Sequence, residues 1–467
     1  MGVSIKFGTD GWRAVIADDF TFSNLDRVAV ATARYFKKHK KIRNGIVIGY
    51  DARFMSREFA ERSAQVFAEN GIKVKLAGSI VSTPMVSLLT KLDNAAGGIV
   101  ITASHNPPRY NGFKIKGDFG GPAHPEMIAK VELELAKVMK LKTVPAPKLS
   151  VDQLVTKKKV TMIDMRQRYL SDLATKIDLN RIKSSGLRIM YDVMYGAGQG
   201  VLDDVLPGIK QIHHIYNPSF AGVNPEPLAS NLTELMQTIA AGGYDIGIAT
   251  DGDADRIGAV DEKGNFVDSH RIFSLLLKYL YEQKGLRGDV VKSFSVTQMV
   301  DDQCKKYGLQ MLETPIGFKH ICRMMTERDV LIGGEESGGL GVKGHIPERD
   351  GIFLGLMLCE LMSVRGKKLS DLVQELMDEF GNHEFKRIDL HTTEREKTRI
   401  MRAYQKGIKE IGGYRVTGRK DTDGFKFFVE GGWVLVRASG TEPLIRFYAE
   451  GTSVSMVDQL LQAATSH

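Results

Sequence analysis

Short runs of β-branched residues alternate with amphipathic helical segments along most of this 467-residue chain. GIVIGYD (residues 45–51) is an apolar run that ends in a turn, and the segment before it, SNLDRVAVATARYF, spaces its apolar residues as on one face of a helix. KVKLAG (73–78) and AGGIVIT (96–102) repeat the strand pattern around another helical segment. Strands that alternate with helices predict βαβ units built on a parallel or mixed sheet.

The same pattern restarts after a linker rich in proline and polar residues, LKTVPAPKLSVDQL (141–154). The last part of the chain differs, because HEFKRIDLH, KFFVEGGWVLVRAS and LIRFYAEG are typical of antiparallel strands around a helix. We therefore expect an α/β protein with three similar α/β domains, each on a mixed sheet, and a smaller α+β carboxyl-terminal domain. The expected domains cover residues 1–150, 151–260, 261–372 and 373–467.

Composition excludes several classes of protein. Hydrophobic residues make up 43% of the chain and charged residues 26%, as in ordinary soluble globular proteins. The formal net charge is +8, but the basic residues are scattered, so no nucleic-acid partner is expected. No apolar run approaches the roughly 20 residues that span a membrane. Cys304, Cys322 and Cys359 lack metal-type spacing and favour a reducing compartment. We expect a cytoplasmic protein, either a monomer or a dimer.

One apolar run ends in an acidic loop, TDGDADR (250–256). Asp251, Asp253 and Asp255 alternate, and alternate residues of an extended loop project to one side. Three carboxylates held together repel one another unless a hard cation collects them, which predicts a catalytic Mg²⁺ site. A calcium-binding helix-loop-helix is the rival, but Arg256 stands where that motif needs glycine, and the preceding YDIGIA is typical of a strand. A plain solvated turn is the third interpretation.

The segment TASHNPPRYNGFK (102–114) places Ser104 beside His105 and then interrupts the backbone with two prolines. An acyl-transfer nucleophile fits badly, because Thr102 and Asn106 stand where the nucleophile elbow has glycines. A serine that carries a phosphoryl group needs a cation and nearby hydrogen-bond donors, and the acidic loop can hold the cation. Alone, the segment is as consistent with a simple turn; with the acidic loop it favours phosphoryl transfer.

Three further turns carry polar residues. RASGTEPLIRFYAE (437–450) forms a hydroxyl-rich turn between two arginines, which suits a phosphate. Its candidate phosphate ligands are Arg437, Ser439, Gly440, Thr441 and Arg446. In GGEESGG (333–339), Glu335 and Ser337 can hydrogen-bond sugar hydroxyls, and FGTDGWRA holds Arg13 in a similar glycine-rich turn. Each of these turns taken alone is as compatible with a solvated loop.

Together these stretches resemble the α-D-phosphohexomutase superfamily. TASHNP is similar to its phosphoserine loop, DGDADR to its metal loop, GEESG to its sugar-binding loop and RASGTEP to its phosphate-binding loop. FGTDGWR, NPEPL (224–228) and TPIGFK (314–319) also fit, and the stretches follow the family order over nearly the whole chain. The resemblance implies four domains around a central cleft, each of which contributes one loop.

The resemblance also implies a reaction on small sugar phosphates. Ser104 would be phosphorylated in the resting enzyme, and Asp251, Asp253, Asp255 and a phosphate oxygen on Ser104 would hold Mg²⁺. The phosphoryl group would pass to a hexose 1-phosphate. The hexose 1,6-bisphosphate so formed would turn round and return its other phosphate to Ser104. Glu335 and Ser337 would grip the sugar. The remaining substrate contacts expected are Arg13, Arg256, Thr314, Gly317, Lys319, Arg437, Ser439, Gly440, Thr441 and Arg446.

A proton must leave the attacking sugar hydroxyl, and the resemblance leaves its acceptor open. Lys114 and His105 are the first candidates, and Lys114 would need its pKa lowered by neighbouring cations. GHIPERDG (344–351) is similar to a family stretch in which a lysine is a proposed acid/base, but Arg349 stands in that place and does not readily give up its proton. The role then falls to His345 or Lys114, or Arg349 only clamps phosphate.

The residue before Ser337 bears on the choice of sugar. The glucosamine enzymes of the family usually have glutamine there, and its mannose/glucose enzymes often have methionine with a following histidine. This chain has Glu336 before Ser337 and glycines after it, which favours a phosphoglucomutase that tolerates mannose phosphates. A phosphoglucosamine mutase is the nearest alternative. A metal-dependent sugar phosphatase with Ser104 as nucleophile is a second, and a regulator that binds sugar phosphates without turning them over is a third.

Overall fold

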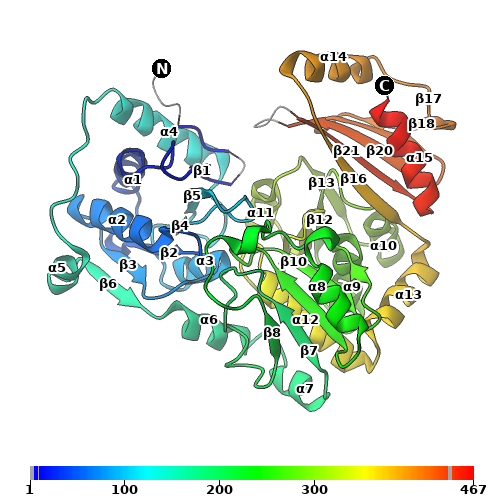
Figure 1. Cartoon of the computed structure of the whole chain (residues 1–467), viewed down its shortest axis with the longest axis horizontal. Coiled ribbons are helices and arrows are strands. Elements are labelled where there is room, and N and C mark those ends of the chain that lie inside the picture. The colour runs from blue at the N-terminus through cyan, green and yellow to red at the C-terminus, as the bar shows by residue number, and fades with distance from the viewer. Residues whose placement is uncertain (1–4, 9, 440–443, 467) are drawn as a thin grey trace.

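Four sheets, one after another along the chain, organise the structure. The computed structural model describes residues 5–8, 10–439 and 444–466. The first three sheets mix parallel and antiparallel strands and pack against helices, and the fourth is antiparallel throughout (Figure 1). Three mixed α/β units followed by an α+β unit confirm the fold class expected from the sequence.

Domain I contains a six-stranded sheet. Its strands are β1 (Trp12–Val15), β2 (Ile46–Tyr50), β3 (Val74–Ala77), β4 (Gly98–Ile101), β5 (Tyr110–Lys116) and β6 (Val160–Ile163). Its helices are α1 (Phe22–Phe36), α2 (Ser56–Glu69), α3 (Thr83–Leu92), α4 (Pro125–Met139) and α5 (Val151–Thr156). The strand order is β1-β5-β4-β2-β3-β6, in which β2, β3, β4 and β6 run parallel and β5 runs against β4. The carboxyl ends of β2 and β4 therefore meet at one edge of the sheet.

Domains II and III repeat this plan with fewer strands. Domain II has β7 (Ile189–Asp192), β8 (Lys210–Ile212), β9 (Ile246–Thr250), β10 (Ile257–Asp261) and β11 (Phe266–Val267), with α6 (Met165–Leu173), α7 (Leu179–Ser184) and α8 (Thr233–Ala240). Domain III has β12 (Asp289–Ser293), β13 (Met311–Thr314), β14 (Val330–Gly334) and β15 (Leu340–Val342). Its helices are α9 (Ser269–Glu282), α10 (Met299–Tyr307), α11 (Phe318–Glu327), α12 (Gly351–Arg365) and α13 (Leu369–Phe380). The strand orders are β11-β10-β9-β7-β8 and β13-β12-β14-β15.

Domain IV is an antiparallel sheet of order β16-β21-β20-β19-β18-β17 with two helices. Its strands are β16 (Glu384–His391), β17 (Glu410–Ile411), β18 (Tyr414–Lys420), β19 (Phe425–Val429), β20 (Gly432–Ala438) and β21 (Leu444–Gly451). Its helices are α14 (Glu394–Gln405) and α15 (Val454–Thr465).

The two largest clusters of buried hydrophobic side chains lie in different parts of the molecule. One continuous cluster of buried side chains runs through domains I, II and III, and domain IV has a cluster of its own. Helix α12 is buried on nearly all sides, because it packs against β9, β10 and α7 of domain II and against α9 of domain III at once. Domain IV joins domain III through an aromatic contact in which Phe294 meets Trp433 and Tyr448.

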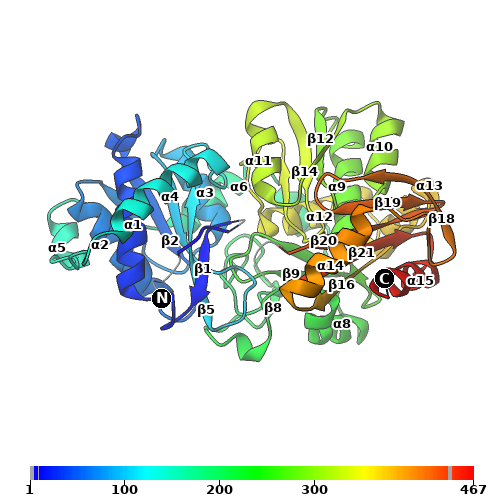
Figure 2. The same ribbon diagram turned by 90° about the horizontal axis from the view of Figure 1, so that it is seen from above.

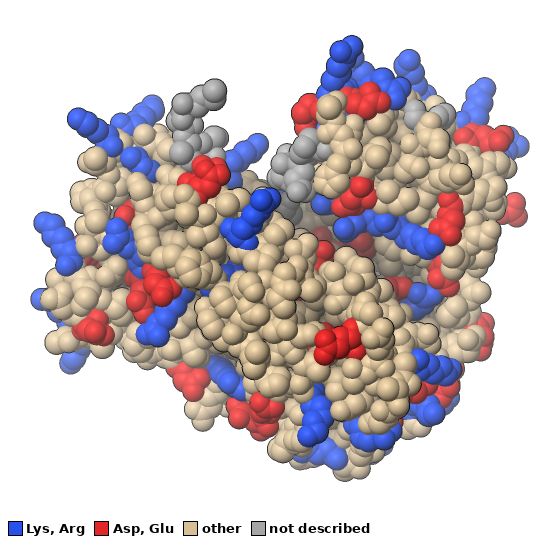
Figure 3. All heavy atoms as spheres, in the orientation of Figure 1, with Lys and Arg blue, Asp and Glu red and all other residues tan. Residues whose placement is uncertain are grey.

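The arrangement leaves a cleft between the domains. Seen from above, domain I stands to one side and domains III and IV lie together on the other (Figure 2). The surface is hollowed between domain I and domain IV (Figure 3), in agreement with the central cleft that was expected.

Two expected boundaries fall inside a sheet. β6 completes the sheet of domain I although it follows residue 150, and β11 completes the sheet of domain II although it follows residue 260. The proline-rich linker indicated an end to domain I, but after this linker the chain returns to the edge of the same sheet. None of the helices among the described residues combines the length and the apolar character that a membrane span requires.

A histidine just after β8 links two acidic residues of domain II. His213 Nδ1 lies 2.9 Å from Asp192 Oδ1, and its Nε2 lies 3.2 Å from Glu234 Oε2. The hydrogen bond to Asp192 raises the pKa of His213, against partial burial, which lowers it. A raised histidine pKa stabilises the folded state below the unfolded-state value near 6.5, and this stabilisation is lost as pH rises through the folded-state value.

We expect His213→Gln to lower the free energy of unfolding by about 1 kcal/mol at pH 5.5 and by clearly less at pH 8.5. Urea unfolding at the two pH values measures the difference. His214→Gln changes the exposed neighbour and serves as the control, with no pH-dependent loss expected. If His213→Gln lost the same free energy of unfolding at both pH values, a positive charge on His213 beside Asp192 and Glu234 would be contradicted.

Candidate active site

The segment after β4 turns sharply at Ser104, which has a left-handed backbone conformation with a φ of 53°. The Ser104 N–H donates to Thr102 Oγ1 at 2.8 Å, and the residue is buried. Arg13, in β1, donates from Nη1 to Asn106 Oδ1 at 2.7 Å, which anchors the next part of the loop. These bonds, with the two stiff prolines that follow, hold the hydroxyl in one direction.

The acidic loop joins β9 to β10, which pair antiparallel, so a strand and not a helix precedes it. This excludes the calcium-binding helix-loop-helix. Asp251 Oδ1 accepts the backbone N–H groups of Asp255 and Arg256, at 2.9 and 3.2 Å. The Ser104 hydroxyl donates to Asp251 Oδ2 at 2.9 Å, so two loops that are 147 residues apart in sequence meet at this pair.

The acidic loop fits a divalent cation. Carboxylate oxygens of Asp251, Asp253 and Asp255 lie within 4.8 Å of one another, and all three residues are buried. Among the described residues, Asp253 Oδ1 and Asp255 Oδ1 find no hydrogen-bond partner although both atoms are shielded from water. Burial and the two neighbouring carboxylates raise the pKa of Asp251 well above its usual value. Hard oxygen donors with an uncompensated negative charge are the ligands that Mg²⁺ prefers.

Two cations from other domains border the acidic loop. Lys114 Nζ, in β5, lies 2.8 Å from Asp253 Oδ2 and 2.9 Å from Asp10 Oδ2. Arg349 Nη2, just before α12, lies 2.6 Å from Asp255 Oδ2 and 2.7 Å from Asp10 Oδ2. Burial lowers the pKa of both cations, but the carboxylates outweigh burial and the pKa of each is raised. Lys114 therefore lacks the lowered pKa that a role as proton acceptor would need, because its nearest charged neighbours are carboxylates and not cations.

The two candidate histidines lie in different places. His105 Nδ1 is 3.4 Å from Ser104 Oγ, and burial together with the charges of Arg256 and Arg13 lowers the pKa of His105 well below its usual value. His345 instead bonds through Nε2 to Asp350 Oδ2 at 2.8 Å, and its Nδ1 lies 3.0 Å from Lys176 Nζ. The fold thus brings His105 within reach of Ser104, whereas the ring of His345 is engaged at a contact between domains.

The expected sugar-binding turn lies between β14 and β15. Glu335 Oε1 accepts the Gly317 N–H at 2.9 Å, which ties this turn to TPIGFK at the start of α11. Burial raises the pKa of Glu335 to about 7. Ser337 is half-buried in the same turn. Gly338 has a φ of 89°, and a Cβ atom there would lie 2.5 Å from the carbonyl oxygen of Ile257, so domain II approaches this turn at a glycine.

The other residues of TPIGFK lie nearby. Thr314 ends β13, and its hydroxyl donates to the carbonyl of Pro315 at 3.1 Å. Lys319, half-buried in α11, borders a cavity of about 140 Å³ that Asp10 also lines. This segment therefore lies between the sugar-binding turn of domain III and the first loop of domain I.

Of the phosphate ligands expected in domain IV, Arg437 lies on β20, Arg446 lies on β21 and Ser439 directly follows β20. Arg437 Nε donates to Asp423 Oδ1 at 2.9 Å, and Asp423 Oδ2 accepts the N–H of Ile316 at 3.0 Å, so this pair connects domain IV to TPIGFK. Arg446 Nε lies 3.5 Å from Asp389 Oδ2. The N–H of Ser439 donates to the carbonyl of Leu444 at 2.9 Å. Gly440 and Thr441 lie outside the described residues.

Sequence reasoning missed three polar residues around the site. Asp10 pairs with Lys114 and Arg349, as described above. Glu226 Oε1 accepts a hydrogen bond from Arg256 Nη1 at 2.8 Å, and Arg53 lies fully buried against the Ser104 loop. Asp10 lies in FGTDGWRA and Glu226 lies in NPEPL, and the charge of each side chain was the signal that could have identified it as a site residue. Arg53 follows a strand end, the place where α/β sheets carry functional residues.

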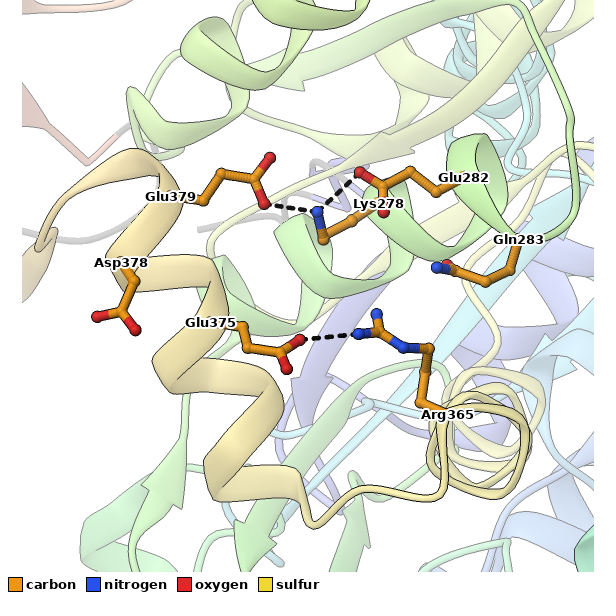
Figure 4. Close-up of a pocket in the computed structure, with 7 residues that line it drawn as sticks. All are labelled: Lys278, Glu282, Gln283, Arg365, Glu375, Asp378 and Glu379. Atoms are coloured by element: carbon orange, nitrogen blue, oxygen red, sulfur yellow. Dashed lines mark hydrogen bonds and ion pairs between the residues drawn. The ribbon is translucent and has the colours of Figure 1, made fainter.

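A larger hollow lies on domain III, away from these loops, between α9, the end of α12 and α13 (Figure 4). Its volume is about 510 Å³. Lys278 pairs with Glu282 at 2.7 Å and with Glu379 at 2.6 Å, and Arg365 pairs with Glu375 at 2.9 Å. Carboxylates on the same or a neighbouring helix neutralise these cations, and none of the residues that line the hollow has the unsatisfied buried oxygens that mark the acidic loop.

Family models give one assignment along the chain. The models described as phosphoglucomutase/phosphomannomutase alpha/beta/alpha domains I, II and III match residues 4–142, 167–264 and 268–380. The model of the C-terminal domain of the same family matches residues 390–466.

Individual relatives agree with this assignment. The phosphoglucomutase/phosphomannomutase of Thermococcus kodakarensis is 30% identical over 98% of this chain and 96% of its own. The phosphoglucosamine mutase of Carboxydothermus hydrogenoformans is 31% identical over 97% of each chain. A solved structure from Thermus thermophilus, named provisionally as a phosphomannomutase, is 34% identical with a TM-score of 0.87 and covers 100% of this chain and 99% of its own. The chain therefore belongs to the α-D-phosphohexomutases, the phosphoglucomutase/phosphomannomutase family of intramolecular phosphotransferases.

Proposed function

We propose that this chain interconverts glucose 1-phosphate and glucose 6-phosphate through a phosphoserine at Ser104 and glucose 1,6-bisphosphate, and that mannose phosphates are also substrates. The observation that carries the proposal is the 2.9 Å hydrogen bond from Ser104 Oγ to Asp251, one of three buried carboxylates. A hydroxyl beside a site for a hard cation suits phosphoryl transfer, which requires mainly positioning and neutralisation of charge.

The residues around Ser104 divide the work. The family is Mg²⁺-dependent, and the ion held by Asp251, Asp253 and Asp255 would neutralise phosphate charge. Lys114 and Arg349 remain cationic, because carboxylates raise the pKa of each, and would add positive charge at the phosphoryl group. In the first transfer the bond between phosphorus and Ser104 Oγ would break as a bond from that phosphorus to a sugar oxygen forms. In the second transfer the bond between the other phosphorus and its sugar oxygen would break as a new bond to Ser104 Oγ forms.

The proton of the attacking hydroxyl needs an acceptor near Ser104. His105 is our first candidate, because its lowered pKa keeps the imidazole neutral near pH 7 and its Nδ1 is 3.4 Å from Ser104 Oγ. Lys114, the other candidate, stays cationic beside its carboxylate neighbours, so it cannot accept this proton and would act only as positive charge at the phosphoryl group. Arg349 would only clamp phosphate, because a guanidinium does not readily give up its proton. The bonds from His345 to Asp350 and Lys176 argue against a direct role for His345.

The cleft would hold the bisphosphate in two orientations. Glu335 and Ser337 would bind sugar hydroxyls in both, and the phosphate that is not reacting would lie at domain IV. The further substrate contacts that we propose are Arg13, Arg256, Thr314, Gly317, Lys319, Arg437, Ser439, Gly440, Thr441 and Arg446. Hexose 1,6-bisphosphate would also prime the enzyme by phosphorylating Ser104.

A phosphoglucosamine mutase is the second candidate, because the Carboxydothermus relative carries that name. Glu336 supports glucose, since the chain has no glutamine before Ser337. We further propose a cytoplasmic enzyme, monomeric or dimeric, whose partners are sugar phosphates. The three cysteines are buried free thiols, as a reducing compartment allows.

The first test compares substrates and follows the phosphate. Wild-type enzyme incubated with phosphorus-labelled glucose 1,6-bisphosphate should keep label on Ser104 and turn over glucose 1-phosphate faster than mannose or glucosamine 1-phosphate. Ser104→Ala should take up no label and lose at least about 1,000-fold in turnover. Ser63→Ala, which changes a buried serine on α2, is the matched control. Faster turnover of glucosamine 1-phosphate would favour the second candidate, and release of free phosphate would favour a phosphatase.

The acidic loop predicts the response to metal. We expect a chelator to abolish turnover and Mg²⁺ to restore it, because Asp253 Oδ1 and Asp255 Oδ1 find no hydrogen-bond partner among the described residues although both are shielded from water. Mn²⁺ binding followed by electron paramagnetic resonance should weaken by at least about tenfold in Asp255→Asn. Asp378→Asn, which changes an exposed acid of the domain III hollow, should bind Mn²⁺ like the wild type. Equal binding by both variants would place the ion elsewhere.

The raised pKa of Glu335 predicts that activity and stability change in opposite directions with pH. Its pKa of about 7 means that it holds a proton below neutrality and then accepts fewer hydrogen bonds from sugar hydroxyls. The ratio of kcat/KM of the wild type to that of Glu335→Gln should fall as pH drops from 8 to 6, and this ratio cancels the ionisation of the substrate. The free energy of unfolding of the wild type should instead fall as pH rises from about 4.5 to 7, because a carboxyl group whose pKa is raised in the folded state makes folding less favourable over that range. Parallel pH profiles for the two enzymes would contradict both expectations.

A further inference from the structure

One fully buried guanidinium has no part in the reaction proposed above. Arg53 follows β2 in the turn that leads to α2, and its side chain has no exposed surface. A buried charge is unfavourable unless it is paired and hydrogen-bonded, so the surroundings of Arg53 indicate what holds it there.

All four bonds from the ends of this guanidinium go to the Ser104 loop. Nη2 donates to the carbonyls of Ser104 and Asn106, each at 2.6 Å. Nη1 donates to the carbonyls of Pro107 and Tyr110, each at 3.0 Å. One side chain thus fixes four carbonyls within seven residues of backbone.

The back and one face of the guanidinium are also held. Arg53 Nε lies 3.2 Å from Asp51 Oδ2, and Asp51 Oδ1 accepts both the Arg53 N–H at 3.0 Å and the Ser56 hydroxyl at 2.7 Å. The ring of Phe220, from domain II, lies over the guanidinium at 5.0 Å from Cζ. Arg53 is therefore a rigid part of the loop's support.

The loop needs such support for three reasons. Its prolines, at 107 and 108, have no N–H to offer a neighbouring carbonyl. Carbonyl groups that point toward one another without a hydrogen-bond donor between them repel one another, and burial removes the water that would otherwise bond to them. Ser104 itself holds a left-handed conformation, which costs about 1 kcal/mol or more for a residue with a side chain. The planar guanidinium of arginine has five hydrogen-bond donors and offsets these three costs, whereas an ammonium group has only three donors.

We propose that Arg53, aligned by Asp51, is a positioning residue for phosphoryl transfer: it fixes the backbone of the Ser104 loop so that Oγ stays beside the acidic loop. Arg53 touches the loop from the protein side and makes no contact with the reacting group. The assignment rests on the proposed role of Ser104 as phosphate carrier. A displacement of about 1 Å at the reacting atom can slow a reaction about 100-fold.

The test measures label transfer at Ser104 in single turnover, with labelled glucose 1,6-bisphosphate as donor, together with kcat and KM for glucose 1-phosphate. We expect Arg53→Gln to slow transfer about 100-fold and to leave KM within about threefold, because the substrate contacts are not touched. Arg53→Lys should recover part of the rate, since three donors replace some of the bonds. Thermal unfolding of each variant reports the folded fraction to which rates are normalised.

The matched control is Arg62→Gln. Arg62 is another arginine of domain I in a two-point pair with an aspartate, with Nε at 2.7 Å and Nη2 at 2.9 Å from the Asp26 carboxylate, but it does not contact the loop. Its loss should lower the unfolding temperature and leave the transfer rate within about twofold of the wild type.

Each outcome decides the assignment. If Arg53→Gln does not fold, Asp51→Asn keeps the guanidinium and removes its anchor, and it should slow transfer about tenfold at unchanged KM. Transfer by the folded Arg53 and Asp51 variants within threefold of the wild type overturns the positioning role alone. A rise in KM with unchanged transfer overturns it as well. A wild-type enzyme that takes up no label on Ser104 overturns the proposed function, and the positioning role falls with it.

Discussion

A buried excess of negative charge in one loop governs how the domains meet. The three carboxylates of the acidic loop are shut off from water, and such a group stays ionised only where cations compensate it. Arg256 of the same loop supplies one compensating charge, and two others come from outside domain II, with Lys114 from domain I and Arg349 from domain III. Asp10 lies between these two cations and pairs with both. The relative placement of three domains is therefore tied to the same atoms that would hold an ion and a phosphate.

The stretch just before α12 extends this principle. Glu348 accepts from Lys116 Nζ of domain I at 2.7 Å, and Asp350 accepts from the Tyr169 hydroxyl of α6 at 2.7 Å. Asp350 Oδ2 also lies 2.8 Å from Nε2 of His345, within hydrogen-bond distance. Buried pairs of this kind add little net stability, but the loss of one partner leaves the other uncompensated, so they specify one arrangement of domains. His345 is best explained as part of this junction.

The local parts of the site could be predicted from the sequence, and the contacts across domains could not. Ser104, the acidic loop and the strands before them follow from patterns within a dozen residues, as does the order of α/β and α+β units. Arg53 and Asp10 bond to residues far along the chain, and their own neighbourhoods do not indicate these distant partners. The direction of the Lys114 pKa could not be predicted for the same reason: it depends on which charges the fold brings near, and these are carboxylates from two other segments.

Some of this long-range information is nevertheless present in the motifs, at their glycines. A Cβ atom at Gly252, between the first two aspartates of the acidic loop, would lie 2.4 Å from the carbonyl oxygen of Ser104. A Cβ atom at Gly338 would lie 2.5 Å from the carbonyl of Ile257. Each glycine stands where the backbone of another domain approaches closely, and for Gly252, which has no left-handed φ, this approach is the reason that glycine is needed. The Ser104 carbonyl that Gly252 accommodates is the same one that Arg53 binds from the other side. The loop that presents the hydroxyl is thus held between two domains, and its position depends on both.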